Sequence, residues 1–521
     1  MKPEDSKYNP ARKNDGSTPL SSVAGRGETG ILQMLLELLE DLDLDQAETK
    51  SGRTVLSWAA ERGYEALVKL LLEQAGVNPN TADTQDGRTP LSLAAEHGHD
   101  GIVKILLERE GIIPDKAGVT TGRTPLSWAA ERGHDGAVKM LLERKDVNPN
   151  QRDTSSGSTP LVWAAWRGQT GAVKLLLERE DINPELADTV SGRTPLSWAV
   201  VSGHDGVVKV LLERGDINPN HGDTTSGSTP LSLAAEGGHE GVVKMLLARE
   251  DINPNKGDTT SGSAPLLWAA WRGQTGVVNL LLEREDINPD QADTASGRTP
   301  LSWAAGGGHD GVVKVLLERG DINPNKGDTI SGSTPLVWAA WNGKVGAVKL
   351  LLERQEINPS QADTKYGRTP LSWAAERGHE GVVKMLSERI NDSTTLDNKG
   401  RTSPSLDLSK GSARAVQTVP EPDDANSDRL ASLPPSAAHG DCLLEMQFRV
   451  HDPNRTITGL DARPTPPPGE HDVGSRVMDP EDLVSKSEGS NFSTEASRPL
   501  QTPSIGPITP PAPSEEHLHP F

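Results

Sequence analysis

The strongest constraint on this chain is an internal repeat with a period of 35 residues. The motif Thr-Pro-Leu, or a close variant, starts at Thr54, Thr89, Thr124, Thr159, Thr194, Thr229, Ala264, Thr299, Thr334 and Thr369. Each of these positions follows the previous one by 35 residues, and an earlier copy starts at Thr18, 36 residues before Thr54. A fixed period of this length indicates one supersecondary unit that is repeated along the chain, rather than a set of separate globular cores.

Each repeat carries the signals of two short helices followed by a loop. In the repeat at Thr194, the threonine is suited to cap the first helix, and Pro195 is suited to its first position. Gly203 is a helix stop, and Asp205 suits the N-terminus of the second helix. The apolar stripes of one helix pair cannot be buried without a neighbouring pair. The sequence therefore predicts an all-α solenoid of about eleven helix-turn-helix units.

The repeat resembles the ankyrin repeat. The shared run is Gly-x-Thr-Pro-Leu-x-x-Ala-Ala-x-x-Gly-His-x-x-Val-Val-x-x-Leu-Leu, which recurs over about residues 16–395. The period exceeds the family's usual value of about 33, the usual histidine after Thr-Pro-Leu is replaced, as at Ser127, and the next leucine is mostly tryptophan, as at Trp128. The longer loop with Asn-Pro resembles ankyrin arrays of filamentous fungi. This resemblance implies an ankyrin solenoid with a concave binding groove.

The two ends of the chain differ in composition from the repeats. Residues 1–15 are polar, whereas residues 396–521 are rich in proline and serine and contain no repeat. Such segments cannot bury enough apolar surface to fold. We therefore expect a disordered N-terminus (1–15), an ankyrin repeat array (16–395) and a disordered C-terminal tail (396–521).

Charge and composition restrict the classes of partner. The net charge of −21 disfavours nucleic acid or an acidic membrane surface. The single cysteine, Cys442, argues against a disulfide framework and a multi-cysteine zinc site. The N-terminus lacks the apolar run of a signal peptide, and no stretch approaches the roughly 18 apolar residues of a membrane span. We expect an intracellular protein, in the cytoplasm or nucleus, with no cofactor, no metal and no small-molecule substrate.

Two columns of polar residues resemble metal-ligand patterns. Gly-His pairs followed by an acidic residue contain His99, His134, His204, His239, His309 and His379, and the loop tips carry Asp153, Asp188, Asp223, Asp258, Asp293, Asp328 and Asp363. Equivalent residues of successive repeats lie too far apart to converge within about 2–2.5 Å of one metal ion. We therefore expect each histidine to bond the neighbouring loop backbone and each aspartate to bond its own turn.

The residue after the Ala-Ala pair is the candidate for partner binding. It is tryptophan in three repeats, glutamate in most others, and Val201 or Gly306 in the rest. A position that accepts glutamate is expected to be exposed, and the resemblance places it in the concave groove. Exposed aromatic residues are typical of binding anchors, although a local packing variant is the alternative. The predicted partner-binding residues are Trp166, Arg167, Trp271, Arg272, Trp341, Asn342, Val201, Glu131 and Arg132.

No catalytic motif accompanies the repeats. The sequence therefore favours a non-enzymatic scaffold or adaptor that binds a protein or peptide partner through the concave groove. The alternative is the ligand-sensing repeat arm of a fungal immune-type or incompatibility receptor that is separated from its nucleotide-binding domain. A neighbouring gene for a nucleotide-binding domain would favour this alternative.

Overall fold

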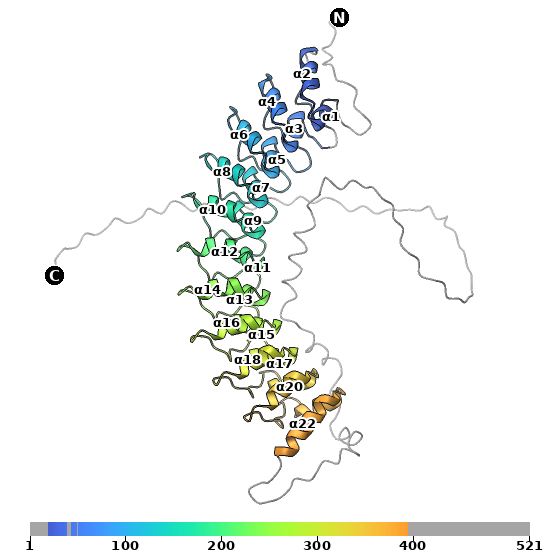
Figure 1. The fold of residues 1–521 in the computed structure, drawn as a ribbon, viewed down its shortest axis with the longest axis vertical. Coiled ribbons are helices and arrows are strands. Elements are labelled where there is room, and N and C mark those ends of the chain that lie inside the picture. The colour runs from blue at the N-terminus through green and yellow to red at the C-terminus, as the bar shows by residue number, and fades with distance from the viewer. Residues whose placement is uncertain (1–18, 39–42, 49–50, 394–521) are drawn as a thin grey trace, which may run out of the picture. The chain divides into compact units, whose positions relative to one another are not determined.

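In a computed structural model, which describes residues 19–38, 43–48 and 51–393, the chain forms a succession of helix pairs, and these residues contain no strand. The first helices of the pairs are α1 (Pro19–Arg26), α3 (Val55–Arg62), α5 (Pro90–His97), α7 (Pro125–Arg132), α9 (Pro160–Arg167), α11 (Pro195–Val201), α13 (Pro230–Gly237), α15 (Pro265–Arg272), α17 (Pro300–Gly307), α19 (Pro335–Trp341) and α21 (Pro370–Glu376). The second helices are α2 (Thr29–Leu38), α4 (Glu65–Glu73), α6 (Asp100–Leu107), α8 (Asp135–Leu142), α10 (Thr170–Leu177), α12 (Asp205–Leu212), α14 (Glu240–Leu247), α16 (Thr275–Leu282), α18 (Asp310–Leu317), α20 (Val345–Leu352) and α22 (Glu380–Ser393). Figure 1 shows the pairs following one another in chain order.

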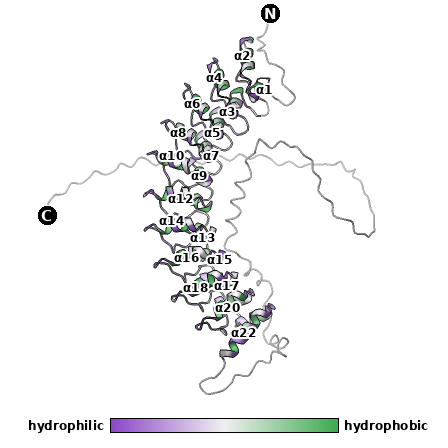
Figure 2. Cartoon of the chain, viewed as in Figure 1, coloured by the Kyte–Doolittle hydropathy of each residue, from purple (hydrophilic) through white to green (hydrophobic). Residues whose placement is uncertain are grey.

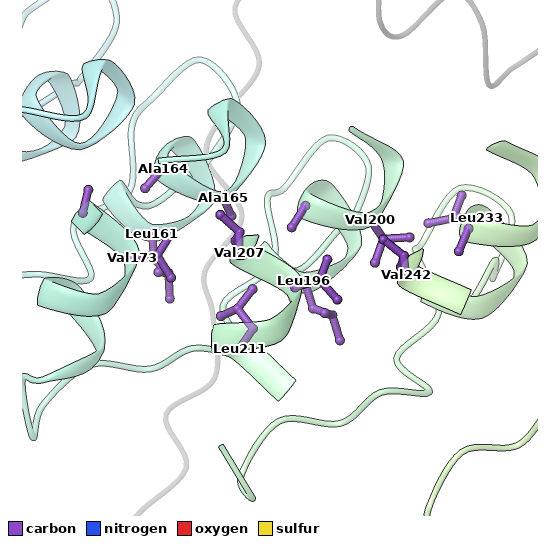
Figure 3. Close-up of a cluster of buried hydrophobic side chains, with 14 of the residues drawn as sticks. Leu161, Ala164, Ala165, Val173, Leu196, Val200, Val207, Leu211, Leu233 and Val242 are labelled. Atoms are coloured by element: carbon purple, nitrogen blue, oxygen red, sulfur yellow. The ribbon is translucent and has the colours of Figure 1, made fainter. Parts of the chain in front are cut away.

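Neighbouring pairs share one continuous hydrophobic core. The first helices pack on each other, as α7 does on α9, and the second helices do the same, as α8 does on α10. Leu161, Val173, Leu196 and Val207 come from four helices of two repeats and are all buried in the cluster shown in Figure 3. Hydrophobic residues recur in each helix pair (Figure 2). The predicted all-α solenoid is confirmed, whereas the disorder predicted for residues 1–15 and 396–521 concerns residues outside the described ones.

The caps of the first helices follow the sequence signals. The hydroxyl of Thr159 accepts a hydrogen bond from the backbone N–H of Val162 at 3.3 Å, and Pro160 occupies the first turn of α9. Gly168 ends this helix with a φ of 75°, and a Cβ atom there would lie 2.7 Å from Nδ1 of His204. Glycine is needed at this position for its left-handed backbone and for the close approach of the next repeat.

Ala264 is the exception among these caps. It occupies the N-cap position of α15, is 3% exposed, and makes no side-chain hydrogen bond to the helix. Replacing Ala264 with threonine is expected to raise the free energy of unfolding by about 1 kcal/mol, because the new hydroxyl can accept from Leu267 N–H. Urea unfolding measures this gain. The control is Thr159→Ala at the equivalent position of another repeat, which should lower the free energy of unfolding by a similar amount. If Thr159→Ala loses stability but Ala264→Thr gains none, the capping explanation is wrong.

The loops between repeats are joined by a ladder of asparagines, formed by Asn80, Asn150, Asn220, Asn255 and Asn325. The side chain of Asn220 is typical: its Oδ1 accepts from Asn253 N–H at 2.8 Å, and its Nδ2 donates to the carbonyl of Asp251 at 2.7 Å. Two positions of this asparagine ladder are aspartate, Asp115 and Asp290. Each still accepts one backbone N–H through Oδ2, at 2.6 Å and 2.8 Å respectively, but cannot donate as an amide does.

Candidate partner-binding face

The candidate site is a column of residues at the C-terminal ends of the first helices, which we call the end column. It consists of the residues after each Ala-Ala or Ala-Val pair: Glu61, Glu96, Glu131, Trp166, Val201, Glu236, Trp271, Gly306, Trp341 and Glu376. Because the period places these residues at equivalent points of successive helices, the fold brings them into one row. The predicted binding residues are therefore spread over several repeats rather than gathered in one pocket.

Glutamates of the end column are not all exposed. Glu131 is 3% exposed, and its Oε2 lies 2.6 Å from Nη2 of Arg123. Glu61 is 8% exposed and lies 2.8 Å from Nη1 of Arg53. The expectation that glutamate marks an exposed position is thus wrong at both residues, because an arginine eight residues earlier neutralises the carboxylate. That arginine directly precedes the capping threonine, and the repeated spacing of Arg and Glu is the sequence signal that would have identified the pair.

Glu131 also orders a residue of the next repeat. Its Oε1 accepts from Nε and Nη2 of Arg167 at 3.1 Å and 2.9 Å. Burial raises the pKa of Glu131, but Arg123 and Arg167 outweigh it and hold the pKa below its usual value. Glu131 is therefore charged at neutral pH and positions Arg167 instead of facing solvent itself.

The three tryptophans of the end column are half-buried and stack on aromatic neighbours. Trp166 has its ring centroid 5.4 Å from that of Trp163 in the same helix and 6.0 Å from that of Trp198 in the next repeat. The guanidinium of Arg167 lies 4.2 Å from the ring centroid of Trp166. Such contacts fix the orientation of the indole while part of the ring stays accessible.

The other two tryptophans repeat this arrangement with one difference. Trp271 lies 5.6 Å from Trp268 and carries Arg272 at 4.2 Å. Trp341 lies 5.1 Å from Trp338 in the same helix, but Asn342 follows it where the other two repeats have arginine. Its cation neighbour comes instead from the following repeat, since the guanidinium of Arg377 lies 5.0 Å from its centroid.

The exposed arginines that follow the end column pair with the preceding repeat. Nη2 of Arg272 lies 2.7 Å from Oε1 of Glu236, and Nη2 of Arg132 lies 3.3 Å from Oε1 of Glu96. Val201 is half-buried and packs against the core. The structure thus brings each predicted arginine beside a glutamate one repeat earlier, so the contact joins two repeats and is not contained in either one.

The histidine and aspartate columns have structural partners. Nε2 of His204 lies 3.0 Å from the carbonyl oxygen of Trp166, and His309 and His379 contact the carbonyls of Trp271 and Trp341 in the same way. His99 and His134 make the same contact, to the carbonyls of Glu61 and Glu96. The predicted backbone contact is thus confirmed for these five histidines, but it reaches the end of a first helix rather than a loop.

Each tip aspartate bonds its own turn, as predicted. Oδ1 of Asp188 accepts from Ser191 N–H at 2.6 Å. The sequence did not reveal its second contact, in which Oδ2 accepts from the indole N–H of Trp198 at 3.0 Å. Equivalent indole contacts of Trp163, Trp303, Trp338 and Trp373 hold the inner tryptophans in place.

Comparison with known proteins identifies the family to which these repeats belong. A family model described as ankyrin repeats (three copies) matches residues 4–83, 75–153, 145–223, 217–293, 266–363 and 323–398. These segments together span most of the 521 residues. No curated protein matches the chain. Among the described residues, none of the helices is both long and apolar enough to cross a membrane.

Proposed function

The chain belongs to the ankyrin-repeat family, and on this premise we propose that it is a scaffold or adaptor that binds a protein or an extended peptide across the end column. Ankyrin repeats are generally protein–protein interaction modules, and proteins built from them are typically non-enzymatic. The observation that carries the proposal is the set of three half-buried, arginine-flanked tryptophans at one helix position. Buried aromatic anchors beside arginine are the residue types that dominate binding energies at interfaces.

The stacked geometry supports this role because the anchors are ordered before a partner arrives. Trp166 and Trp271 each contact both a tryptophan of the same helix and an arginine, so little side-chain entropy remains to be lost on binding. Arg167 and Arg272 are themselves held by glutamates of the preceding repeat. Their remaining N–H groups can donate to acidic groups of a partner.

The spacing of the anchors favours a macromolecular ligand. Trp166 and Trp271 are three repeats apart, and Trp271 and Trp341 are two repeats apart. At roughly 10 Å per layer of packed helices, the three anchors span on the order of 50 Å. A small molecule cannot contact all three, whereas a protein surface or an extended peptide can.

The test replaces Trp166, Trp271 and Trp341 with alanine, singly and together, in the full chain. Partners are first identified by affinity purification with mass spectrometry, and their affinities are then measured for each variant. We expect each single change to weaken binding by about 30-fold, which corresponds to about 2 kcal/mol for a hot spot. The variants should remain folded by circular dichroism, because the buried leucines of these helices are unchanged.

The control is Trp58→Ala, which removes a tryptophan that precedes the Ala-Ala pair, as Trp163 does, instead of one from the end column. It should leave the affinity for the partner unchanged. If the triple variant unfolds, or retains every partner at the affinity of the wild type, then the tryptophans of the end column are packing residues and the proposed function is wrong.

A further inference from the structure

Six repeats place an arginine directly before the capping threonine, and we call these residues the cap arginines: Arg53, Arg88, Arg123, Arg193, Arg298 and Arg368. Four of them form an ion pair with the end-column glutamate eight residues later: Arg53 with Glu61, Arg88 with Glu96, Arg123 with Glu131, and Arg368 with Glu376. Arg193 instead lies 3.4 Å from Asp223. Arg298 alone has no carboxylate within ion-pair distance among the residues that the structure describes.

Arg298 is half-buried, and its guanidinium packs against aromatic rings. Its guanidinium lies 3.7 Å from the ring centroid of Trp303 and 3.9 Å from that of Trp338. Nη2 donates to the carbonyl of Ser302 at 3.1 Å, while Nε is buried with no hydrogen-bond partner. The indole N–H groups of both rings donate to tip aspartates, which fixes the two walls of the site.

Arg123 provides a matched site within the same chain. Its guanidinium lies 3.7 Å from Trp128 and 4.0 Å from Trp163, and its Nη2 donates to the carbonyl of Ser127 at 3.1 Å. The difference between the two sites is the counter-ion. Glu131 fills the first site and is held by both Arg123 and Arg167.

At the Arg298 site, a glycine stands where the Arg123 site has Glu131, and an asparagine stands where the Arg123 site has Arg167. Gly306 occupies the position of Glu131, and Asn342 occupies that of Arg167. A Cβ atom at Gly306 would lie 2.8 Å from Nη2 of Arg298 and 3.5 Å from Nδ2 of Asn342. Nη2 of Arg298 therefore lies directly against the place where a glutamate side chain would begin and would have to shift slightly to admit one, and Nδ2 of Asn342 lies beside it.

The charge of Arg298 is partly compensated by Asp293 and Asp328, which act on it from beyond ion-pair distance. Burial lowers the pKa of Arg298 to about 10, so the guanidinium still carries its proton at neutral pH. A half-buried cation without a carboxylate in contact is only partly compensated, and an incoming carboxylate can form a charge-assisted hydrogen bond with it.

We propose that Arg298 and Asn342 form a binding site for a glutamate or aspartate side chain of the partner, whose carboxylate takes the place that Glu131 fills in the matched site. This inference rests on the proposed function, because it places an acidic residue of the same partner one repeat before Trp341. Trp303 and Trp338 hold the guanidinium, and Asn342 supplies a second donor from the exposed end of α19.

The first test uses propionate as a probe for a side-chain carboxylate. The full chain is labelled with [15N]arginine, and the Nε–H signal of Arg298 is assigned by its loss in Arg298→Lys. Propionate, but not chloride, should shift this signal in a saturable manner. In Gly306→Glu the introduced carboxylate should occupy the site, so the signal should no longer respond to propionate. No saturable shift, or the same shift in Gly306→Glu, would overturn the proposal.

The second test compares Gly306→Glu with Gly306→Gln, which has nearly the same shape but no charge. The glutamate variant should unfold at a higher temperature than the glutamine variant, because only the glutamate can pair with Arg298. Equal unfolding temperatures of the two variants would mean that a carboxylate at position 306 does not pair with Arg298. The comparison cancels the gain in helix propensity that both variants share over glycine.

The third test measures the affinity of the partner for the Gly306→Glu variant. Gly306→Glu should weaken its binding by at least tenfold, and neutralising one acidic residue of the partner should have the same effect. If propionate binds but the partner is indifferent to Gly306→Glu, the side-chain source is wrong and the site takes a free carboxylate. If the tryptophan variants keep their partners, the proposed function fails, while the propionate response of Arg298 is unaffected by that result.

Discussion

Replacing Glu131 with alanine is expected to lower the free energy of unfolding by about 3 kcal/mol or more, because it leaves Arg123 buried without its carboxylate. The side chains of Arg123 and Glu131 are 6% and 3% exposed, and their closest atoms are 2.6 Å apart. The change also releases Arg167, whose guanidinium Glu131 holds. Urea unfolding of the full chain measures the loss.

The chain offers a matched control in Glu376→Ala. Glu376 forms the equivalent ion pair with Arg368 in the last complete repeat, but the two side chains are 51% and 37% exposed. Exposed ion pairs contribute about 0–1 kcal/mol, so this variant should lose far less stability than Glu131→Ala. Equal losses in the two variants would show that burial does not determine the strength of this pair.

The stability lost in Glu131→Ala should depend on pH, because the pKa of Glu131 is lowered in the folded protein. A carboxyl group whose pKa is lower in the folded state stabilises the fold above the unfolded pKa of about 4.3, and this contribution is lost as the pH falls through the folded pKa. The stability difference between the wild type and Glu131→Ala should therefore be largest near neutral pH and should shrink below about pH 4. A difference that stays constant down to pH 3 would contradict the charged state assigned to Glu131.

Replacing both Asp115 and Asp290 with asparagine is expected to stabilise the array by about 2–4 kcal/mol. Oδ1 of each aspartate is buried without a hydrogen-bond partner. In the asparagine ladder, the equivalent amide Nδ2 donates to a carbonyl of the next repeat, as Asn255 does to Asp286 at 2.6 Å. Each asparagine would thus add a hydrogen bond and remove a partly buried charge, for about 1–2 kcal/mol per site. The sites are five repeats apart, so their effects should add.

The converse change, Asn255→Asp, is the control and should destabilise the array by a similar amount. Burial raises the pKa of both Asp115 and Asp290. A carboxyl group with a raised folded pKa binds its proton more tightly when folded, so its destabilising effect at neutral pH is relieved as the pH falls through that pKa. The gain of the double variant should accordingly shrink under acidic conditions. If Asn255→Asp loses stability but the double variant gains none at neutral pH, the explanation by the asparagine ladder is wrong.

The sequence by itself determined the features that lie within one repeat. The threonine caps, the prolines at the first helical position and the glycine stops predicted the first helices, and the apolar stripes predicted that the pairs must stack. The aspartate at each tip was correctly expected to bond its own turn, because its donors lie only two or three residues away. Local spacing is sufficient for such contacts.

Only the tertiary structure decided the character of the end column. Glutamate at this column suggested an exposed position, yet Glu131 is buried because Arg123 reaches it from the start of the same helix and Arg167 reaches it from the next repeat. Arg298 has the same sequence neighbours as Arg123 over the first half of its repeat, yet it has no ion pair of the Arg123–Glu131 kind, because Gly306 stands where that glutamate would be. The physical reason is that contacts between repeats, such as the ion pair of Glu131 with Arg167 and the cation–π contact of Arg298 with Trp338, join residues 36 and 40 positions apart, whereas capping and turn signals act within a few residues.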